Sequence, residues 1–334
     1  MSELQGILST IGNTPLVRLR RLLPGLDAEV LAKLEFFNPG GSIKDRSALS
    51  MLADKIHAGE LVPGRSTVVE SSSGNLALGI AQVCGYFRLR FVCVVDARTT
   101  EQNRALLRAH NVEVEVIDRP DPTTGEYLPQ RIRRVRELVE SIPGAYWPNQ
   151  YANPLNSRAH ERTMGEIVRA LAGRVDYLFC AVSSCGTLRG CADYVRRHGL
   201  RTRIIAVDAA GSQIFDGQQP RPRLLPGHGA SVRPALFDPT AAHDVVHVTD
   251  LDCVLACHRL VAREAVLAGG SSGATVAALS AYADRIPAGS SCVLVFPDGG
   301  DRYLDTIYSD SWTRRHLGVT RDAARPLDTT GAKL

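Results

Sequence analysis

Short apolar runs alternate with amphipathic stretches along most of the chain. The apolar runs have the length of strands, and the stretches between them place apolar residues at the spacing of one helix face. We expect strands at residues 30–36, 67–69, 89–95, 112–117, 177–182, 204–207, 245–248 and 292–296, with a short one after residue 14. Helices are expected at residues 42–61, 74–84, 101–110, 132–142, 157–172, 187–198, 250–267 and 274–283, with an extended loop at 211–243.

The expected strands are apolar throughout instead of alternating, which is typical of parallel sheets covered by helices on both faces. There are too many strand–helix units for one sheet of ordinary size, and the chain of 334 residues is long enough for two domains. We therefore predict an α/β fold with two doubly wound parallel-sheet domains. A smaller, mobile domain covers residues 42–150, a larger one covers 1–41 and 151–313, and the polar stretch 314–334 is predicted to be a disordered tail.

Composition narrows the functional classes. A hydrophobic fraction of 44%, a charged fraction of 22% and a net charge of +4 are those of a soluble globular protein, and no lysine-rich run is present. Nucleic-acid binding is therefore disfavoured. The apolar runs are far shorter than a membrane span, and the first residues do not begin a signal peptide, so we expect a cytoplasmic protein that does not bind membranes.

Most of the eight cysteines lie inside apolar runs, which predicts buried structural thiols. Cys253 and Cys257 share a helix face next to His258, which by itself suggests a metal site. A second pair of ligands at zinc-like spacing does not follow, so we expect no metal.

The nonapeptide from Asn38 to Arg46 holds one of only four lysines in the chain. An apolar run stops at Asn-Pro, two glycines form a turn, and Ser42 can cap the next helix, so Lys44 falls in its first turn. The helix dipole and burial both disfavour a charged ammonium there and so favour a nucleophilic amine. Lys44 is therefore the candidate for a Schiff base, ahead of Lys33, Lys55 and Lys333.

Three other strand-to-helix turns carry unusual chemistry at the edge where parallel sheets bind ligands. The segment 70–76 offers three serines and free amides to a carboxylate, although serines there also serve as helix caps. The segment 183–187 suits a phosphate, and 269–273 presents a hydroxyl to a ring nitrogen. With the amine of Lys44, these turns supply what pyridoxal phosphate and an amino-acid substrate require.

These motifs resemble the fold-type II pyridoxal-phosphate enzymes of the cysteine synthase and cystathionine β-synthase family. The likeness extends from the segment 11–16, Ile-Gly-Asn-Thr-Pro-Leu, to the segment 297–303, Pro-Asp-Gly-Gly-Asp-Arg-Tyr. The resemblance implies a cofactor between the two domains and Lys44 as its Schiff-base lysine. It implies that Asn75 contacts the 3′ oxygen of the cofactor and that Ser271 contacts its pyridine nitrogen. The cofactor's phosphate would be bound by the segment Ser183, Ser184, Cys185, Gly186 and Thr187. The substrate carboxylate would be bound by Ser72, Ser73, Gly74 and Gln150.

Ser271 bears on the reaction type. A neutral hydroxyl stabilises a protonated pyridine less than a carboxylate does, so loss of a β-substituent competes well against transamination. We expect Lys44 to remove the α-proton, the β-substituent to leave, and a nucleophile to replace it. The predicted enzyme is thus a β-replacing transferase or synthase.

Departures from the cysteine synthase pattern indicate a branch of the family. The phosphate segment reads Ser-Ser-Cys-Gly-Thr instead of Gly-Thr-Gly-Gly-Thr, Leu76 follows Ser-Gly-Asn where threonine is usual, and Tyr151 replaces phenylalanine. These features resemble the branch that joins O-phospho-L-serine to L-glutamate as N-(2-amino-2-carboxyethyl)-L-glutamate. Its product supplies 2,3-diaminopropionate for siderophores or peptide antibiotics.

A dicarboxylate nucleophile needs additional cationic or hydroxyl groups. The candidates are Arg131, Tyr151 and Ser183. Arg131 fits a solvated helix face equally well, and for its neighbours Arg133 and Arg134 a solvated helix face is the better interpretation. The alternatives are a cysteine synthase that uses sulfide with O-acetylserine or O-phosphoserine, and a cofactor-binding protein without turnover. A nicotinamide dehydrogenase is disfavoured, because the sequence lacks the spaced glycines that bind a dinucleotide. The family resemblance implies a homodimer acting on small amino acids.

Overall fold

The computed structural model describes residues 6–123, 125–217 and 219–319, and it contains two sheets. The larger sheet has six strands in the order β1-β2-β10-β7-β8-β9, in which only the edge strand β1 is antiparallel. Its strands are β1 (Leu16–Arg18), β2 (Ala28–Leu34), β7 (Tyr177–Ala181), β8 (Arg203–Ala209), β9 (Asp244–Val248) and β10 (Ser290–Phe296). The two central strands β10 and β7 are buried along almost their whole length, as their uninterrupted apolar sequences predict.

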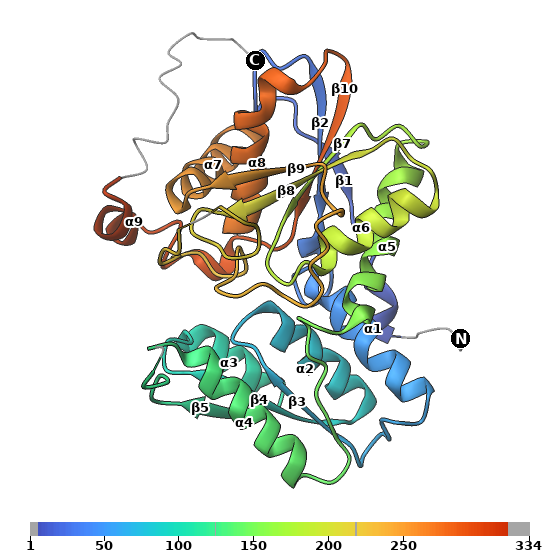
Figure 1. The fold of residues 1–334 in the computed structure, drawn as a ribbon, viewed down its shortest axis with the longest axis vertical. Helices are drawn as coiled ribbons and strands as arrows, with labels where there is room; N and C mark the ends of the chain where they lie inside the picture. The colour runs from blue at the N-terminus through green and yellow to red at the C-terminus, as the bar shows by residue number, and fades with distance from the viewer. Residues whose placement is uncertain (1–5, 124, 218, 320–334) are drawn as a thin grey trace.

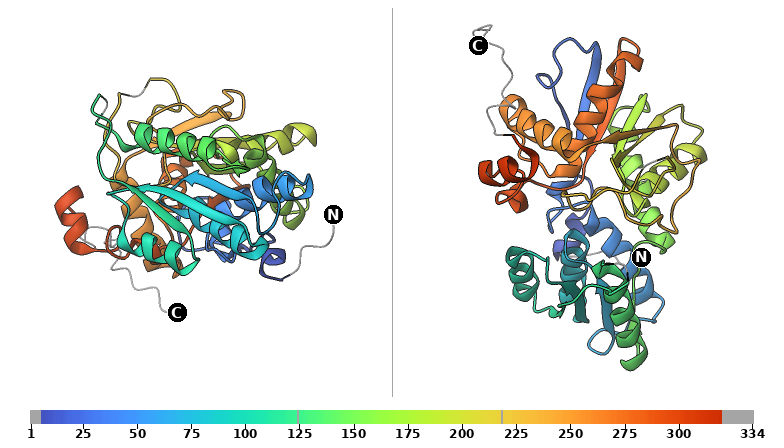
Figure 2. Two further views of the ribbon diagram at one scale, coloured as in Figure 1. Left: turned by 90° about the horizontal axis from the view of Figure 1, so that it is seen from below. Right: turned by 60° about the vertical axis from the view of Figure 1, so that its left-hand side comes forward.

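The smaller sheet has four parallel strands in the order β5-β4-β3-β6. They are β3 (Thr67–Ser71), β4 (Arg90–Asp96), β5 (Glu113–Ile117) and β6 (Ala145–Tyr146). The two sheets and their helices form two bodies, one above the other in Figure 1 and still distinct in the right-hand view of Figure 2. The predicted α/β class with parallel sheets is confirmed, while the exact domain boundaries stay predictions.

Helices cover both faces of each sheet (Figure 1). The α-helices are α1 (Lys44–His57), α2 (Asn75–Phe87), α3 (Glu101–Ala109), α4 (Tyr127–Ser141), α5 (Pro154–Ala170), α6 (Gly186–Arg197), α7 (Asp250–Glu264), α8 (Gly270–Tyr282) and α9 (Asp310–Leu317). Short 3-10 helices are η1 (Gly6–Thr10), η2 (Glu35–Phe37), η3 (Ala283–Arg285) and η4 (Asp301–Tyr303). Helix α1 packs against both α2 and α5 and so connects the two bodies.

Two expectations from the sequence need correction. The helix expected from residue 42 begins at Lys44, whose backbone N–H donates to the Ser42 hydroxyl at 3.2 Å. Residues 314–317 were assigned to a disordered tail but form the end of α9, which Ser309 caps and whose Trp312 packs on the main core. The rest of that predicted tail, from residue 320, lies outside the described residues.

The long connection between β8 and β9 contains neither helix nor strand in its described parts, as the sequence predicts. None of the helices in residues 6–319 that the structure describes is long and apolar enough to cross a membrane. Within the same ranges, no group of three or more His, Cys, Asp or Glu side chains is placed to hold a metal ion.

Candidate active site

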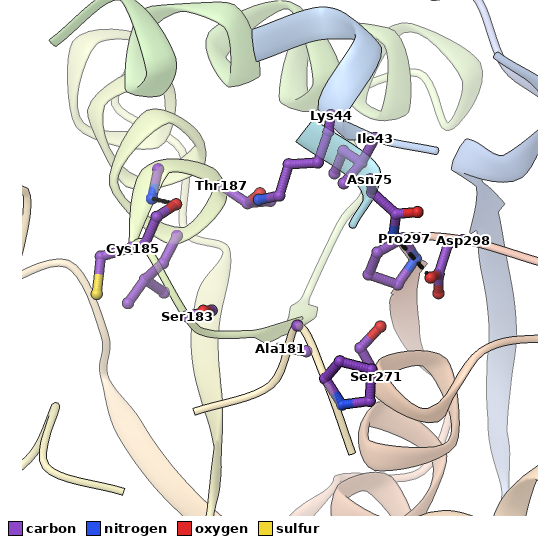
Figure 3. Close-up of a pocket in the computed structure, with 15 residues that line it drawn as sticks. Ile43, Lys44, Asn75, Ala181, Ser183, Cys185, Thr187, Ser271, Pro297 and Asp298 are labelled. Atoms are coloured by element: carbon purple, nitrogen blue, oxygen red, sulfur yellow. Dashed lines mark hydrogen bonds between the residues drawn. The ribbon is translucent and has the colours of Figure 1, made fainter. Parts of the chain in front are cut away.

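One pocket lies where the carboxyl ends of strands from both sheets meet helix N-termini (Figure 3). About 500 Å³ of space free of protein atoms lies within it, part of which is open to solvent. The structure brings all the predicted cofactor-binding residues into its lining: Lys44, Asn75, Ser183, Ser184, Cys185, Gly186, Thr187 and Ser271. Their roles stay predictions, but their convergence from α1, α2, the β7–α6 turn and α8 is a finding.

Lys44 reaches into the pocket from the first turn of α1 (Figure 3). The start of this helix is held against the end of β10, because the Ile43 N–H donates to the Pro297 carbonyl at 2.8 Å. Burial lowers the pKa of Lys44 below its usual value, against the opposing influence of Asp298 and Cys185. The pocket therefore favours a neutral amine, as the sequence predicts.

The other lysines are engaged elsewhere. Lys33 is buried and contacts Glu166 at 2.7 Å, and Lys55 pairs with Glu60 at 2.7 Å on the surface. Lys333 lies outside the described residues. Among the residues that the structure describes, Lys44 is thus the lysine whose amine has neither an ion pair nor a hydrogen bond, which leaves it available for a ligand.

The β7–α6 turn is held from behind by a buried chain of polar side chains. The Ser184 hydroxyl accepts hydrogen bonds from Asn156 Nδ2 at 3.2 Å and from the Gly186 N–H at 3.5 Å. Asn156 Oδ1 accepts from the Ser47 hydroxyl at 2.7 Å, and Ser47 lies 3.1 Å from His160 Nε2. This chain, which we call the support network (Ser184, Asn156, Ser47 and His160), joins α1, α5 and α6.

Two backbone features adapt this turn to its place. Cys185 has φ of 64°, in the left-handed region that costs a non-glycine residue about 1–2 kcal/mol. A Cβ at Gly186 would lie 2.5 Å from Asn156 Oδ1, so only glycine lets the helix start approach the support network. The turn leaves the Ser183 and Thr187 side chains and the N-terminus of α6 facing the pocket, a suitable arrangement for a phosphate.

Asp298 is a pocket residue that sequence reasoning missed. It follows β10, and its carboxylate accepts hydrogen bonds from Asn75 Nδ2 at 2.8 Å and from the Tyr303 hydroxyl, while Oδ1 has no partner among the described residues. Burial raises the pKa of Asp298. The sequence could have identified Asp298 as a pocket residue from its position, two residues after a central buried strand, because ligands bind at such strand ends.

Asn75 begins α2 and lies next to Asp298 on the same side of the pocket (Figure 3). Its Oδ1 accepts a hydrogen bond from Arg302, which also donates to the Gly40 carbonyl at 2.6 Å. The segment from Pro297 to Tyr303 thereby links the end of the larger sheet to the first turn of a helix that covers the smaller one.

The predicted substrate turn, Ser72, Ser73 and Gly74, follows β3 and is half-buried. Its bonds to the rest of the fold are few: the Ser73 carbonyl accepts from Asn103 Nδ2 at 2.8 Å and the Ser72 carbonyl from Cys93 Sγ at 3.1 Å. None of the three lines the pocket itself. Leu76 is packed in the core of the smaller body, so its side chain does not reach a substrate.

The remaining substrate candidates lie beside the phosphate turn but outside the pocket lining. The Gln150 carbonyl accepts from Asn156 Nδ2 at 2.7 Å, which connects it to the support network. Burial raises the pKa of Tyr151, while the positive charge of Arg131 and a hydrogen bond with Ser183 act in the opposite direction. Arg131 projects from α4 and contacts Asp96 at 3.3 Å, so it is not a free solvated side chain.

A buried ionic cluster behind Lys44 was also missed. Arg46, two residues after Lys44, contacts Glu35 at 2.6 Å and Glu166 at 2.7 Å, and Glu166 also contacts Lys33 at 2.7 Å. All four side chains are almost inaccessible to solvent. The sequence shows these charges but not that they meet, because four separate elements, β2, η2, α1 and α5, bring them together.

Comparison with known proteins identifies the class. The model of the family described as "Pyridoxal-phosphate dependent enzyme" matches residues 7–298, and the chain belongs to that family. The resemblance, the enzyme class and the cofactor class expected from the sequence are thereby confirmed.

More particular relatives are similar over nearly their whole length. The chain is 46% identical over 312 residues to the N-(2-amino-2-carboxyethyl)-L-glutamate synthase of Ralstonia nicotianae, covering 93% of this chain and 91% of that protein. It is 44% identical to the protein of the same name from Cupriavidus metallidurans, covering 92% and 91%. Among solved structures, O-ureido-L-serine synthase matches with a TM-score of 0.84 at 33% identity, covering 91% of this chain and 94% of that one.

The pocket fits the family's cofactor on its own chemistry. An unpaired amine at Lys44, hydroxyl groups at Ser183, Thr187 and Ser271, and a glycine-lined helix start face one space. When bound there, pyridoxal phosphate supplies the electron sink that makes the α-hydrogen of an amino acid acidic. The donors that would hold its phosphate and ring nitrogen lie on the larger sheet's side, and Lys44 lies on α1.

Proposed function

We propose that this enzyme replaces the phosphate of O-phospho-L-serine with the amine of L-glutamate, giving N-(2-amino-2-carboxyethyl)-L-glutamate and phosphate. The single observation that supports this choice of substrates is the 46% identity over 93% of the chain to a synthase of that name. The pocket supports the reaction class, because an unpaired amine of lowered pKa stands beside the turn that we propose to bind phosphate. Asn75, which follows the serine-rich turn 72–74, lines the same pocket.

In this proposal the chain's residues act as follows. The turn 72–74 orients the donor's carboxylate with serine hydroxyls and backbone amides. The neutral Lys44 amine takes the proton from Cα, and the Cβ–O bond breaks with its electron pair leaving on phosphate. The glutamate nitrogen then bonds to Cβ and loses a proton, and Lys44 returns a proton to Cα. Atoms and charges balance without an oxidant or reductant.

Several finer proposals follow from the same assignment. The product contains a 2,3-diaminopropionate unit, which supports a role in supplying that unit for a siderophore or peptide antibiotic. All eight cysteines are free and buried, which supports work in a reducing compartment such as the cytoplasm. An exposed apolar groove between α1 and α5 supports a homodimer; it is lined by residues including Ile11, Leu49, Ala53, Leu155 and Ala159.

The test supplies purified holoenzyme with O-phospho-L-serine and either L-glutamate or sulfide. We expect the glutamate adduct by mass spectrometry, with one phosphate released per adduct. Lys44→Ala should form none, while Lys55→Ala, a surface change on the same helix, should keep the activity. Formation of cysteine from sulfide with no glutamate adduct would replace the proposal with a cysteine synthase.

A further inference from the structure

Part of the long β8–β9 connection, residues 219–243, borders the active site. It runs along the side of the larger sheet that faces the smaller body (Figure 1), and Pro226 and Gly227 line the pocket. The Gly229 N–H donates to the Val182 carbonyl at 2.7 Å, which fixes the segment to the residue immediately before Ser183. Side chains on this segment are therefore placed relative to the phosphate turn.

Arg223 is held in this segment in a defined position. Its Nη1 donates to the His228 carbonyl at 3.2 Å, and its side chain lies over Gly229. A Cβ at Gly229 would come within 2.6 Å of Arg223 Nη1, and the residue's φ of +71° also favours glycine. The half-buried guanidinium is thus packed against the same glycine that bonds to Val182.

No ion pair joins Arg223 to an acidic side chain in the described ranges, unlike Arg46 and Arg131. The charge of Arg223 acts on Asp208 at the end of β8, whose pKa is raised by burial and lowered in part by Arg223. Among the described residues, Asp208 Oδ2 has no hydrogen-bond partner and lies 4.0 Å from His247 Nε2. A partly buried cation without a counter-ion is costly unless a ligand supplies the negative charge.

Arg223 lies on the β8–β9 connection and Arg131 on α4, and neither side chain is part of the pocket lining itself. The charges of both act on the hydroxyl of Tyr151, which also has a hydrogen bond with Ser183. The Tyr151 carbonyl accepts from the Leu236 N–H at 3.1 Å, so this tyrosine is attached to the same segment as Arg223. Arg131 already has Asp96 as a partner, whereas Arg223 is packed over Gly229, which bonds to the residue before Ser183. Arg223 is therefore the cation that is open to the second carboxylate of a dicarboxylic amino acid.

We propose that Arg223 binds the side-chain carboxylate of the incoming amino acid and so selects a dicarboxylate nucleophile over a neutral one. This inference rests on the proposed function, because it deepens the assignment of glutamate as nucleophile. A guanidinium suits the task, since its planar donors match a carboxylate with two parallel hydrogen bonds.

The test compares Arg223→Gln and Arg223→Lys with Arg221→Gln, a change at an exposed arginine of the same segment. KM is measured for L-glutamate, L-glutamine and O-phospho-L-serine in holoenzymes of matched cofactor absorbance and thermal stability. We expect Arg223→Gln to raise the KM for glutamate about ten- to hundredfold and to abolish the preference for glutamate over glutamine. Arg223→Lys should recover most of that preference, and Arg221→Gln should change nothing.

The outcomes separate the two levels of the assignment. An unchanged glutamate KM in Arg223→Gln overturns the inference, and so does a rise confined to O-phospho-L-serine, which would assign Arg223 to the donor's phosphate. A wild-type enzyme that makes no glutamate adduct overturns the proposed function instead. Should Arg223→Gln fail to fold, the same comparison is made with Arg223→Met, and an unchanged preference for glutamate over glutamine in that variant overturns the inference.

Discussion

The two serine-rich turns that start α2 and α6 are alike in sequence and differ in their support. The turn at 183–187 is mostly buried and is backed by the support network, which reaches α1 and α5. The turn at 72–74 is half-buried, and the side chains of Asn103 and Cys93 bond it to its surroundings, each through one backbone carbonyl of the turn. A resident cofactor needs a preformed site, whereas a substrate enters and leaves in every cycle, so unequal support suits the two proposed ligands.

The buried side chains near each turn also differ in kind. Behind the larger sheet's turn lie the support network and the ionic cluster of Lys33, Glu35, Arg46 and Glu166, all buried. The core under the smaller sheet's turn is mainly aliphatic. The predicted consequence is that changes beneath the phosphate turn affect stability and cofactor binding, while changes near the substrate turn affect mainly the amino-acid steps.

The largest effect is expected from Glu166→Gln. Removing this carboxylate leaves Lys33 and Arg46 with one fewer buried counter-charge, at a cost of about 3–5 kcal/mol in the free energy of unfolding. Urea denaturation measures it, with Glu101→Gln as control, because Glu101 pairs with Arg108 on the surface and should lose less than about 1 kcal/mol. Equal losses in the two variants would contradict the account.

The same residue predicts a pH dependence. Burial alone would raise the pKa of Glu166, but the hydrogen bonds and charges of Arg46 and Lys33 hold it at about 2. Because the pKa is lowered in the folded state, the ionised carboxylate stabilises the fold fully at pH values above the ordinary pKa of 4.5. This stabilisation is lost as the pH falls from there toward 2. The wild type should therefore lose stability over that window more steeply than Glu166→Gln.

An intermediate effect is expected from Asn156→Ala, which interrupts the support network. The Gln150 carbonyl loses its partner, at a cost of about 1–3 kcal/mol for a buried group, the Ser47 hydroxyl keeps only His160, and Ser184 loses its support. Titrating the apoenzyme with pyridoxal phosphate should show at least about tenfold weaker binding.

The matched change at the other turn is Asn103→Ala, which removes the hydrogen bond to the Ser73 carbonyl. It should leave cofactor affinity unchanged and raise the KM for O-phospho-L-serine. Weaker cofactor binding in this variant, equal to that of Asn156→Ala, would show that the two turns do not differ in role.

The smallest effects are expected in α2, where two glycines differ in their surroundings. A Cβ at Gly79 would lie 3.1 Å from both the Lys44 carbonyl and Ala48 Cβ, whereas one at Gly85 meets no atom within 4 Å. Gly79→Ala should cost about 1 kcal/mol by pushing α2 from the start of α1, and Gly85→Ala should gain about 0.5–1 kcal/mol. Thermal unfolding measures both, and a gain at Gly79 would mean that α1 tolerates the shift.

Local signals predicted the parts of the site that are local. Lys44, Asn75 and the turn at 183–187 lie where a strand ends and a helix begins, and glycine and serine mark such places in a sequence. The sequence does not show which face of α2 Leu76 occupies, and in the structure its side chain packs into the core. The family resemblance supplied the roles that geometry alone does not assign.

The remaining features depend on contacts between distant segments. Asp298 meets Asn75 only after the two bodies assemble, and Glu166 meets Lys33 and Arg46 only when α5 packs beside β2 and α1. Helix α9 was missed because its sequence is polar and lacks periodicity, and it forms where Trp312 finds the main core. Such pairings leave no spacing pattern along the chain that sequence reasoning can read.

The central claim is that Lys44, between the two turns, carries the cofactor. Borohydride reduction of the holoenzyme followed by trypsin digestion tests it most directly, because a modified Lys44 blocks cleavage and leaves residues 34–46 as one peptide. We expect the pyridoxyl mass on that peptide, and a folded, colourless, unlabelled protein for Lys44→Ala. Label on a peptide containing Lys33, Lys55 or Lys333, or cofactor absorbance that persists in Lys44→Ala, would contradict the account.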